Sequence, residues 1–246
     1  MHAKAPPIRL PVFVFDFGGV LIKWKNNDPI FDYVARRYGI PVAPMRRELE
    51  AALPGLETGQ VTMRECLEAA LGKFGKRLRE GDSPDALWTL PFERLMKPRK
   101  GALKVVESLR RRGYRAYMFS NTSPPHAAYL RRTGWTEIVD GFVASCEIGS
   151  MKPSAEAFSR ALREIGARAS EVVFIDDREA NVRGAEAYGI RRALRFTSVA
   201  RLKRDVDQAV AAALAAFAAW RRSSLSRRSK ILFAFREIVA DRAAEL

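Results

Sequence analysis

The sequence has few of the residues from which disulfide frameworks and zinc sites are built. Its 246 residues include two cysteines and two histidines, and Cys66 and Cys146 stand far apart in no metal-binding spacing. This pattern excludes a disulfide scaffold and a zinc motif. It fits a reducing compartment, and we expect a cytoplasmic protein.

Long hydrophobic runs are also missing. The longest uncharged apolar stretch, residues 208–220, is rich in alanine and falls short of the roughly 20 residues that a membrane-spanning helix needs. Near the N-terminus the apolar run 11–15 is interrupted by Asp16, and no small-residue cleavage pattern follows it. We therefore expect a soluble protein with no export signal and no membrane span.

Positive charge, by contrast, is abundant. The chain holds 43 Lys and Arg residues against 28 Asp and Glu, which gives a formal net charge of +15. Such a surplus favours anionic ligands, whether a phosphorylated metabolite, nucleic acid or a lipid surface, and it does not choose among them. With 48% hydrophobic residues, the chain is long enough for one large core or for a core with a small accessory domain.

Short apolar runs alternate with helical patterns along most of the chain. Val12–Phe15 is wholly apolar and is followed by Asp16 and two glycines, which is typical of a buried parallel strand ending in a turn. Further strands are expected at 114–119, 141–144, 172–175 and 192–196, with helices at 102–112, 154–165 and 181–188. The alternation predicts an α/β fold with a doubly wound, Rossmann-like parallel sheet, which binds ligands at the carboxyl ends of its strands.

Residues 29–92 have a different pattern. They contain no alternating run of β-branched residues, and helix-breaking sequences stand at 39–41, 54–55 and 81–84. This composition predicts a helical bundle inserted into the α/β sequence after its first strand.

Polar groups stand at or near the ends of the predicted strands: Asp16, Ser120-Asn121-Thr122, Lys152-Pro153 and Asp176-Asp177. A carboxylate such as Asp16 can attack phosphorus and split a hard hydrolysis into two easier steps, and the glycines beside it leave room for a phosphoryl group. The Ser120 hydroxyl, neighbouring backbone N–H groups and the Lys152 ammonium would stabilise the charge on the transferring oxygens. Each residue alone has a structural explanation, as a turn aspartate, a serine cap or a solvated lysine. Their order in the sequence favours the functional interpretation.

The same carboxylates suggest a metal. Magnesium prefers hard oxygen ligands, with one or two carboxylates, the phosphate itself and retained waters. Asp16 and Asp177, with Asp176 nearby, meet that requirement, so we expect Mg²⁺ as the cofactor.

Four segments resemble the motifs of the haloacid dehalogenase superfamily: Val-Phe-Asp-Phe-Gly-Gly-Val-Leu (14–21), Phe-Ser-Asn-Thr (119–122), Met-Lys-Pro (151–153) and Phe-Ile-Asp-Asp-Arg-Glu-Ala-Asn-Val (174–182). Within this superfamily, the sequence more closely resembles the branch that contains α-D-glucose-1-phosphate phosphatase and the N-terminal phosphatase domain of soluble epoxide hydrolase. The resemblance covers roughly residues 12–196. It implies a phosphoric monoester hydrolase that passes through an aspartyl-phosphate and acts on a small phosphorylated substrate.

The resemblance also implies roles for individual residues. Asp16 corresponds to the nucleophile and a metal ligand, with the Gly18 carbonyl as a second ligand and Asp177, with Asp176 beside it, completing the magnesium site. Ser120, Asn121 and the turn glycines Gly18 and Gly19 correspond to phosphate-binding positions, and Lys152 to the cation that balances nucleophile and phosphate. Asn181 occupies a place often held by another polar site residue, and Asp176 is alternatively an outer-shell group.

One position departs from the family pattern. Most of its phosphatases carry a second aspartate two residues after the nucleophile, which protonates the leaving alcohol and then activates water; this chain has Gly18 there. Loss of a general acid–base costs about 10²- to 10⁴-fold in rate. The glucose-1-phosphatase branch resembles this chain in having Gly, which favours sugar 1-phosphates, whose leaving group needs less protonation.

His126, six residues after Ser120, is a candidate to hold the substrate or donate a proton. The alternative, a surface histidine on an exposed helix start, has somewhat more weight. His2 has no role that the sequence supports. A dehalogenase remains a weaker alternative, because it needs no magnesium and leaves the two consecutive aspartates without a role.

The resemblance divides the chain into an α/β core of residues 1–23 and 96–200, a helical cap of residues 24–95, and an extension of residues 201–246. The cap would close over the substrate, and its segment 57–62 resembles a typical stretch of such caps. The extension combines an apolar stripe at 206, 210, 214 and 217 with the basic run 221–230 and a second apolar-rich segment, 231–240.

The extension leaves several alternatives open. The basic run is either a solvated linker between helices or a binding segment for nucleic acid or an anionic surface, and the apolar stripe leaves a homodimer open. A second functional hypothesis follows: a catalytically weak or inactive module that lost its acid–base at Gly18 and binds an anionic partner through its basic surface.

Overall fold

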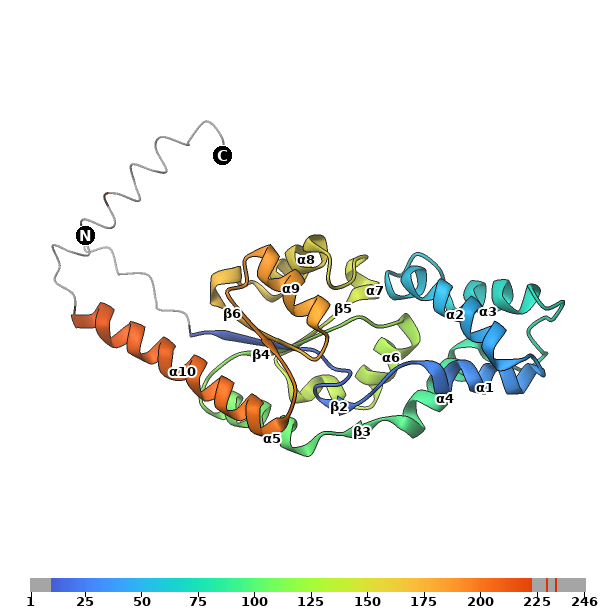
Figure 1. Cartoon of the computed structure of the whole chain (residues 1–246), viewed down its shortest axis with the longest axis horizontal. Coiled ribbons are helices and arrows are strands. Elements are labelled where there is room, and N and C mark those ends of the chain that lie inside the picture. The colour runs from blue at the N-terminus through green and yellow to red at the C-terminus, as the bar shows by residue number, and fades with distance from the viewer. Residues whose placement is uncertain (1–9, 223–228, 230–232, 234–246) are drawn as a thin grey trace. The chain divides into compact units, whose positions relative to one another are not determined.

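The computed structural model describes residues 10–222, 229 and 233, and its centre is a five-stranded parallel sheet (Figure 1). The strand order is β5-β4-β1-β6-β7, with every neighbouring pair parallel. The strands are β1 (Val12–Phe15), β4 (Ala116–Ser120), β5 (Gly141–Ala144), β6 (Val172–Asp176) and β7 (Arg192–Arg195). The expected α/β fold with a parallel sheet is therefore confirmed.

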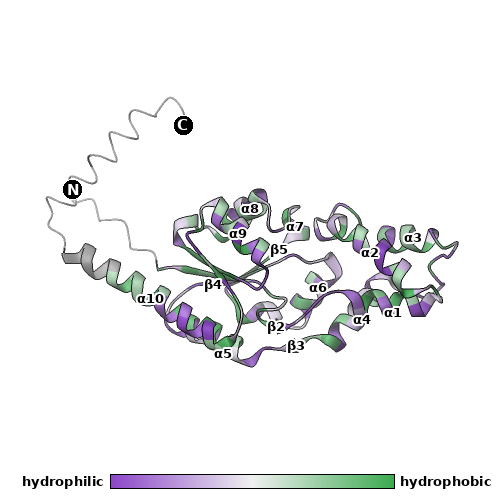
Figure 2. Cartoon of the chain, viewed as in Figure 1, coloured by the Kyte–Doolittle hydropathy of each residue, from purple (hydrophilic) through white to green (hydrophobic). Residues whose placement is uncertain are grey.

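Helices cover both faces of this sheet. Successive strand residues point to opposite faces: Val12 and Val14 pack in one cluster with Phe158 of α8, whereas the Phe13 ring meets Tyr114 edge-on at 5.7 Å. In Figure 1, α8 and α9 lie on one side of the sheet and α5 on the other, and hydrophobic residues dominate the central strands (Figure 2). The core helices are α5 (Lys100–Arg111), α6 (Pro124–Arg132), α7 (Ser145–Ile148), α8 (Ala155–Ile165) and α9 (Glu179–Tyr188), with short 3₁₀ turns η1 (Trp135–Ile138) and η2 (Ala169–Glu171).

A helical bundle is inserted after the first strand. The chain enters it through β2 (Ile22–Lys23) and leaves it through β3 (Lys97–Pro98), which pair with each other antiparallel. The bundle has its own apolar contacts, such as the Phe31 ring against Trp88 at 5.7 Å. Its helices are α1 (Asp28–Tyr38), α2 (Val42–Glu57), α3 (Met63–Gly72) and α4 (Pro84–Leu95). We call this bundle the cap; its boundary as a separate domain stays a prediction.

One predicted helix break is wrong. Residues 54–55 were expected to interrupt the bundle, but α2 continues through both and ends at Glu57. Pro54 forfeits one N–H donor yet keeps a helical φ, and it lies in the last turn, where its carbonyl accepts the Thr58 N–H at 3.0 Å. The consequence is that Glu57 closes the helix and faces the core.

The extension begins with a long helix, α10 (Val199–Arg222). Residues up to Asp205 belong to the same compact unit as the sheet and the cap, and the part of α10 from Val206 onward belongs to a second unit. Most of the basic run 221–230 and the whole of 231–240 except Phe233 lie outside the described residues, as does His2. No helix within the described part of the chain has the length and hydropathy needed to cross a bilayer.

Candidate active site

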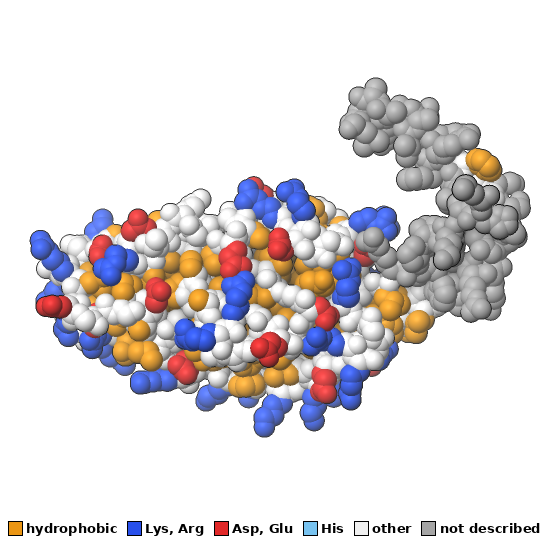
Figure 3. All heavy atoms as spheres, turned by 180° about the vertical axis from the view of Figure 1, so that it is seen from behind, with side chains coloured by type: hydrophobic (Ala, Val, Ile, Leu, Met, Phe, Trp, Pro, Cys, Tyr) orange, Lys and Arg blue, Asp and Glu red, His pale blue; other side chains and the backbone are white. Residues whose placement is uncertain are grey.

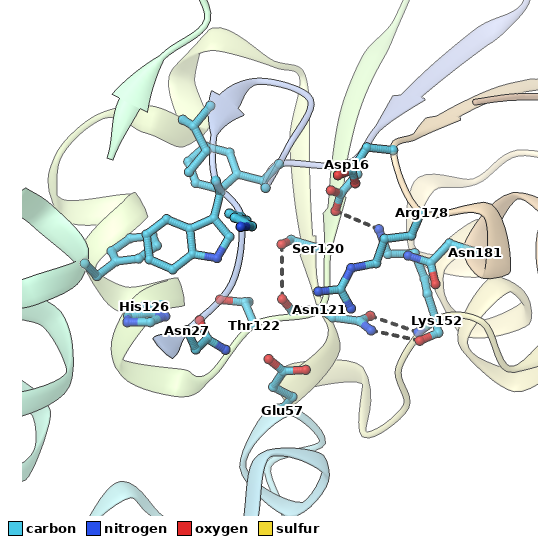
Figure 4. Close-up of a pocket in the computed structure, with 17 residues that line it drawn as sticks. Asp16, Asn27, Glu57, Ser120, Asn121, Thr122, His126, Lys152, Arg178 and Asn181 are labelled. Carbon is cyan, nitrogen blue, oxygen red and sulfur yellow. Dashed lines mark hydrogen bonds and ion pairs between the residues drawn. The ribbon is translucent and has the colours of Figure 1, made fainter. Parts of the chain in front are cut away.

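The predicted polar residues meet at the carboxyl edge of the sheet because parallel strands end at one edge. Asp16 follows β1, Ser120 ends β4 and Asp176 ends β6, and β1 lies between the other two strands. Lys152 arrives from the loop between α7 and α8. Figure 4 shows Asp16, Ser120 and Lys152 around a cavity of about 90 Å³.

Lys152 is the centre of the site. Its ammonium is 1% exposed and donates hydrogen bonds to Asp16 Oδ1 at 2.8 Å, Asp176 Oδ2 at 2.7 Å and the Phe119 carbonyl at 2.8 Å. Burial alone would lower the Lys152 pKa, but the two carboxylates outweigh it and hold that pKa above its ordinary value. Lys152 therefore stays a cation against the Asp16 carboxylate.

Asp16 and Asp177 carry more negative charge than this lysine neutralises. Burial raises the pKa of Asp16 to about 7, against the opposing pull of Lys152, and burial together with Asp176 also raises the Asp177 pKa. Ligand oxygens of Asp16, Asp176 and Asp177 lie within 4.8 Å of one another. Hard oxygen donors with uncompensated charge fit a divalent cation such as Mg²⁺.

The two consecutive aspartates differ in their surroundings. Asp176 is fully buried, and its oxygens accept hydrogen bonds from Lys152, the Arg178 backbone N–H at 2.9 Å and Asn181 Nδ2 at 3.0 Å. Asp177 is half-buried and lines the cavity. Asp177 is thus the more available ligand, whereas Asp176 holds Lys152 in place and is itself held by Asn181.

Asn121 acts mainly on the neighbouring loop. Its Nδ2 donates to the Lys152 carbonyl at 2.8 Å, and its Oδ1 accepts the Lys152 backbone N–H at 2.8 Å. This reciprocal pair fixes the Lys152 loop against the end of β4. The Ser120 hydroxyl lies at the cavity wall beside Asn121 and Thr122, where it can donate to a phosphoryl oxygen.

The two glycines that follow Phe17 have different surroundings. Gly18 lines the cavity, and a Cβ there would meet Trp24 Cδ1 at 3.4 Å, an ordinary contact. Gly19 does not line it; its φ is +81°, and a Cβ there would overlap the Asp177 carboxylate. Arg99 donates to the Gly19 carbonyl at 3.0 Å. Gly19 therefore makes room for Asp177, a contribution that differs from the phosphate binding the sequence suggests.

The expectation of a surface histidine at position 126 is wrong. The His126 side chain is 6% exposed, its ring stacks on Phe92 at 4.0 Å, and its Nε2 lies 3.2 Å from the Trp88 carbonyl. Burial lowers the His126 pKa to about 4, so the ring is neutral near pH 7. The sequence could not show this, because α4 of the cap supplies both neighbours. His126 lines the cavity as an aromatic wall, which leaves it a candidate for holding substrate and a poor proton donor.

Several cavity residues were not singled out from the sequence. Glu57 belongs to the segment 57–62 noted for its resemblance to other caps, and Arg178 directly follows the two aspartates, so both had a weak signal. Phe17 lies within the motif 14–21, which assigned it no role, and the remaining residues come from the cap and its connection to β1, where no motif marks them. The lining residues outside the predicted set are Phe17, Ile22, Trp24, Lys25, Asn27, Glu57, Phe92 and Arg178.

The chain is similar to known phosphatases. A sesquiterpene phosphatase from Aspergillus oryzae is 26% identical over 178 residues, which cover 72% of this chain and 85% of that protein. A ribulose-1,5-bisphosphate 5-phosphatase from Halopiger xanaduensis is 35% identical over 121 residues, 47% of this chain and about half of its own length. These relatives agree with the expectation of a phosphatase-type hydrolase.

Solved structures share the fold. One of a haloacid dehalogenase family enzyme from Bacteroides thetaiotaomicron, in complex with magnesium and inorganic phosphate, superimposes with a TM-score of 0.62 at 22% identity. The match covers 76% of this chain and 94% of that one.

Two family models match different parts of the chain. The aldehyde dehydrogenase family matches residues 195–246, which are almost entirely the extension. The haloacid dehalogenase-like hydrolase model matches residues 10–189, which contain four of the five sheet strands, the cap and every cavity residue. The expected superfamily is confirmed: the chain belongs to the haloacid dehalogenase-like hydrolases.

Proposed function

We propose that this chain is a magnesium-dependent phosphohydrolase that acts on a small phosphorylated metabolite through an aspartyl-phosphate on Asp16. The observation that carries the proposal is the buried Lys152, which bridges Asp16 and Asp176 at a cavity that Asp177 also lines. A lysine held against a carboxylate nucleophile attracts a phosphate dianion to that carboxylate and offsets the repulsion between the two.

Each residue has its own role in the first step, the transfer of the phosphoryl group to Asp16. Asp16 lies at the cavity with one oxygen held by Lys152, so its carboxylate is oriented for in-line attack on phosphorus. Ser120 Oγ lines the cavity and would donate to a phosphoryl oxygen. Asn121 keeps the loop after β4 and the Lys152 loop in register, so both reach the same phosphoryl group.

Asp16, Asp177 and the Gly18 carbonyl would hold the magnesium ion. When bound, the ion supplies positive charge to the phosphoryl oxygens and lowers the pKa of Asp16, which burial otherwise raises. Asp176 supports the site from behind, because Lys152, Arg178 N–H and Asn181 occupy its oxygens.

A sugar phosphate suits the cap side of the cavity. A cavity of about 90 Å³ corresponds to roughly three water molecules, so it holds the phosphoryl group while the leaving group extends toward the cap. There the Trp24 indole offers an apolar face, and Asn27 and Arg178 offer hydrogen-bond donors. Hydroxyl-bearing rings use both kinds of contact.

Turnover of p-nitrophenyl phosphate with and without Mg²⁺ tests the proposal without presupposing the natural substrate. We expect metal-dependent release of nitrophenol, ³²P labelling of the protein, and a loss on the order of 10⁴-fold or more in Asp16→Asn. Asp32→Asn, in a cap helix away from the cavity, is the matched control. Absence of metal-dependent turnover, or full activity in Asp16→Asn, would refute a phosphatase.

The binding-module alternative has weaker support. On the face seen in Figure 3, Lys and Arg side chains are spread over cap and core and are interspersed with acidic ones, so this face has no single basic patch. Several arginines of the described chain pair with carboxylates, for example Arg131 with Glu147 at 2.6 Å and Arg110 with Asp140 at 3.0 Å.

Binding of the extension to nucleic acid or an anionic surface, a homodimer and a cytoplasmic location stay predictions. Salt-dependent retention on anionic vesicles or RNA by the full chain would support an electrostatic role of the extension. Binding that is insensitive to salt would argue against it.

A further inference from the structure

The cavity contains a carboxylate that the phosphohydrolase chemistry described so far does not use. Glu57, the last residue of α2, points into the cavity from the cap, and in Figure 4 it lies on the opposite side from Asp16, beyond Ser120 and Asn121. Among the described residues its carboxylate has no hydrogen-bond partner. A half-buried carboxylate that lines a cavity and has no hydrogen-bond partner in the described chain calls for a functional explanation.

The segment that carries Glu57 is fastened to the core. Ser145, the first residue of α7, donates to the Glu57 carbonyl at 2.6 Å and accepts the Thr122 backbone N–H at 2.9 Å. Gly59 lies so close to the Cys146 carbonyl, with φ at +70°, that no Cβ would fit. Ser145 thus joins the end of the cap helix directly to the loop after β4, so the position of Glu57 is defined relative to the phosphoryl group.

In-line displacement at phosphorus puts the leaving oxygen opposite the attacking one. With Asp16 on one side of the cavity, the leaving group extends to the side where Glu57 stands. Gly18 leaves the usual acid–base position without a functional group, and the neutral His126 faces the Trp88 carbonyl.

We propose that Glu57 is the general acid and base of this enzyme, supplied by the cap in place of the residue that Gly18 lacks. The proposal rests on the phosphohydrolase function above. In the first step an Asp16 oxygen forms a bond to phosphorus, the bond from phosphorus to the leaving oxygen breaks, and Glu57 gives that oxygen its proton. In the second step water attacks phosphorus, the bond to Asp16 breaks, and Glu57 takes a proton from the water. The products are the alcohol and inorganic phosphate.

The surroundings suit both protonation states. Burial raises the Glu57 pKa to about 7, while Arg178 and Lys152 oppose that rise, and an acid–base group works best with a pKa near the working pH. The other ionisable groups that share its space are Lys25, Asp16 and Asp177 around the cavity and Cys146 beside the loop, whose own pKa Glu57 helps to raise. In the wild type, kcat/KM for an alkyl phosphate should fall at alkaline pH as Glu57 loses its proton.

The test compares Glu57→Gln with Glu50→Gln, which makes the same change on an exposed residue of the same helix. The substrates are p-nitrophenyl phosphate, whose leaving group needs little protonation, and n-propyl phosphate, whose leaving group needs it fully, both with Mg²⁺. We expect Glu57→Gln to lower kcat/KM for propyl phosphate about 10²- to 10⁴-fold and for nitrophenyl phosphate less than about tenfold.

Because the second step also needs the base, Glu57→Gln should accumulate phosphorylated Asp16. Rapid mixing should then show a burst of one nitrophenol per protein followed by slow turnover, and the alkaline fall in kcat/KM for propyl phosphate should disappear. Glu50→Gln should behave as the wild type.

The outcomes separate the two proposals. The role of Glu57 is overturned if Glu57→Gln leaves propyl phosphate turnover unchanged, or if it lowers turnover of both substrates equally without a burst. The phosphohydrolase function still stands in either case, provided that wild-type activity requires Asp16. A wild type that neither turns over p-nitrophenyl phosphate nor becomes labelled overturns both. Misfolding is excluded as the cause of lost activity if the variant has the wild-type far-ultraviolet circular dichroism spectrum and a urea midpoint equal to or above that of the wild type.

Discussion

The core and the cap face the same cavity but hold their side chains differently. On the core side, Lys152, Asp176, Asn121 and Asn181 form a continuous hydrogen-bond network of two strand ends, a loop and a helix. On the cap side, Glu57 is held through its backbone carbonyl by Ser145, and its carboxylate has no hydrogen-bond partner among the described residues. One half of the cavity is built before substrate arrives, and the other half keeps its functional group free.

This difference matches the chemistry that each side performs. The charge that develops on a phosphoryl group is the same for every substrate, so fixed charges and donors around it cost no reorganisation. A leaving group differs from substrate to substrate and has to exchange a proton twice, which requires a group that is not already engaged. The comparison predicts that core substitutions will cost folding stability and activity together, whereas the cap substitution Glu57→Gln will separate them.

Lys152→Met should have the largest effect. The substitution keeps the side-chain length but leaves the buried Asp16 and Asp176 carboxylates facing each other without a cation. Breaking a buried pair in this way costs about 3–5 kcal/mol, which urea denaturation at pH 7 would measure. Lys104→Met, on an exposed position of α5, is the control.

The cost of Lys152→Met should shrink as the pH falls, because Asp16, whose pKa burial raises to about 7, takes up a proton and the repulsion disappears. A stability loss below about 1 kcal/mol at pH 7 would mean that the hydrogen-bond network around Lys152 is not formed before substrate binds. The proposed difference between the core side and the cap side of the cavity would then be wrong.

Gly19→Ala should come next. A side chain at this position has to adopt a positive φ, which costs about 1–3 kcal/mol, and its Cβ also overlaps the Asp177 carboxylate. We therefore expect lower stability together with weaker activation by Mg²⁺, seen as a higher metal concentration at half-maximal turnover. Gly39→Ala shares the positive φ but has nothing within reach of its Cβ, so it should reproduce the stability loss and leave metal activation unchanged.

The contrast also explains how far the sequence could be interpreted. Asp16, Ser120, Lys152 and Asp177 were identifiable because each stands at a fixed distance from a strand end or in a short motif, and parallel strands bring their ends to one edge. His126 and Glu57 depend on how the cap packs on the core: His126 is buried by residues of α4, and Glu57 reaches the cavity because α2 continues through Pro54. No local pattern encodes such packing between distant segments.

Glu57→Gln should have a smaller effect on stability, and of the opposite sign to Lys152→Met. The Glu57 pKa is about 7 in the folded chain and 4.5 ordinarily. Between these values the unfolded chain releases the proton and the folded chain keeps it, so this residue lowers the free energy of unfolding as pH rises from 4.5 to 7. The Gln variant lacks this loss and should be more stable than the wild type by on the order of 1–2 kcal/mol at pH 8, and equal to it at pH 4.

Urea titrations of both proteins across this range would measure the difference, with Glu50→Gln expected to show no such trend. A Glu57→Gln protein that is less stable at pH 8 would mean that the carboxylate is paired after all.

The smallest effect is expected from Gly18→Asp in the wild-type background. A Cβ fits beside Trp24, so the variant places a carboxylate where related phosphatases have their acid–base, but Glu57 already performs that step. We expect less than about a tenfold gain on propyl phosphate and a smaller one on nitrophenyl phosphate. In the Glu57→Gln background the same substitution should restore a larger part of the lost propyl phosphate activity, since a general acid contributes about 10²- to 10⁴-fold. Equal effects on both substrates in both backgrounds would mean that protonation of the leaving group does not limit this enzyme, and that the free carboxylate on the cap side has another purpose.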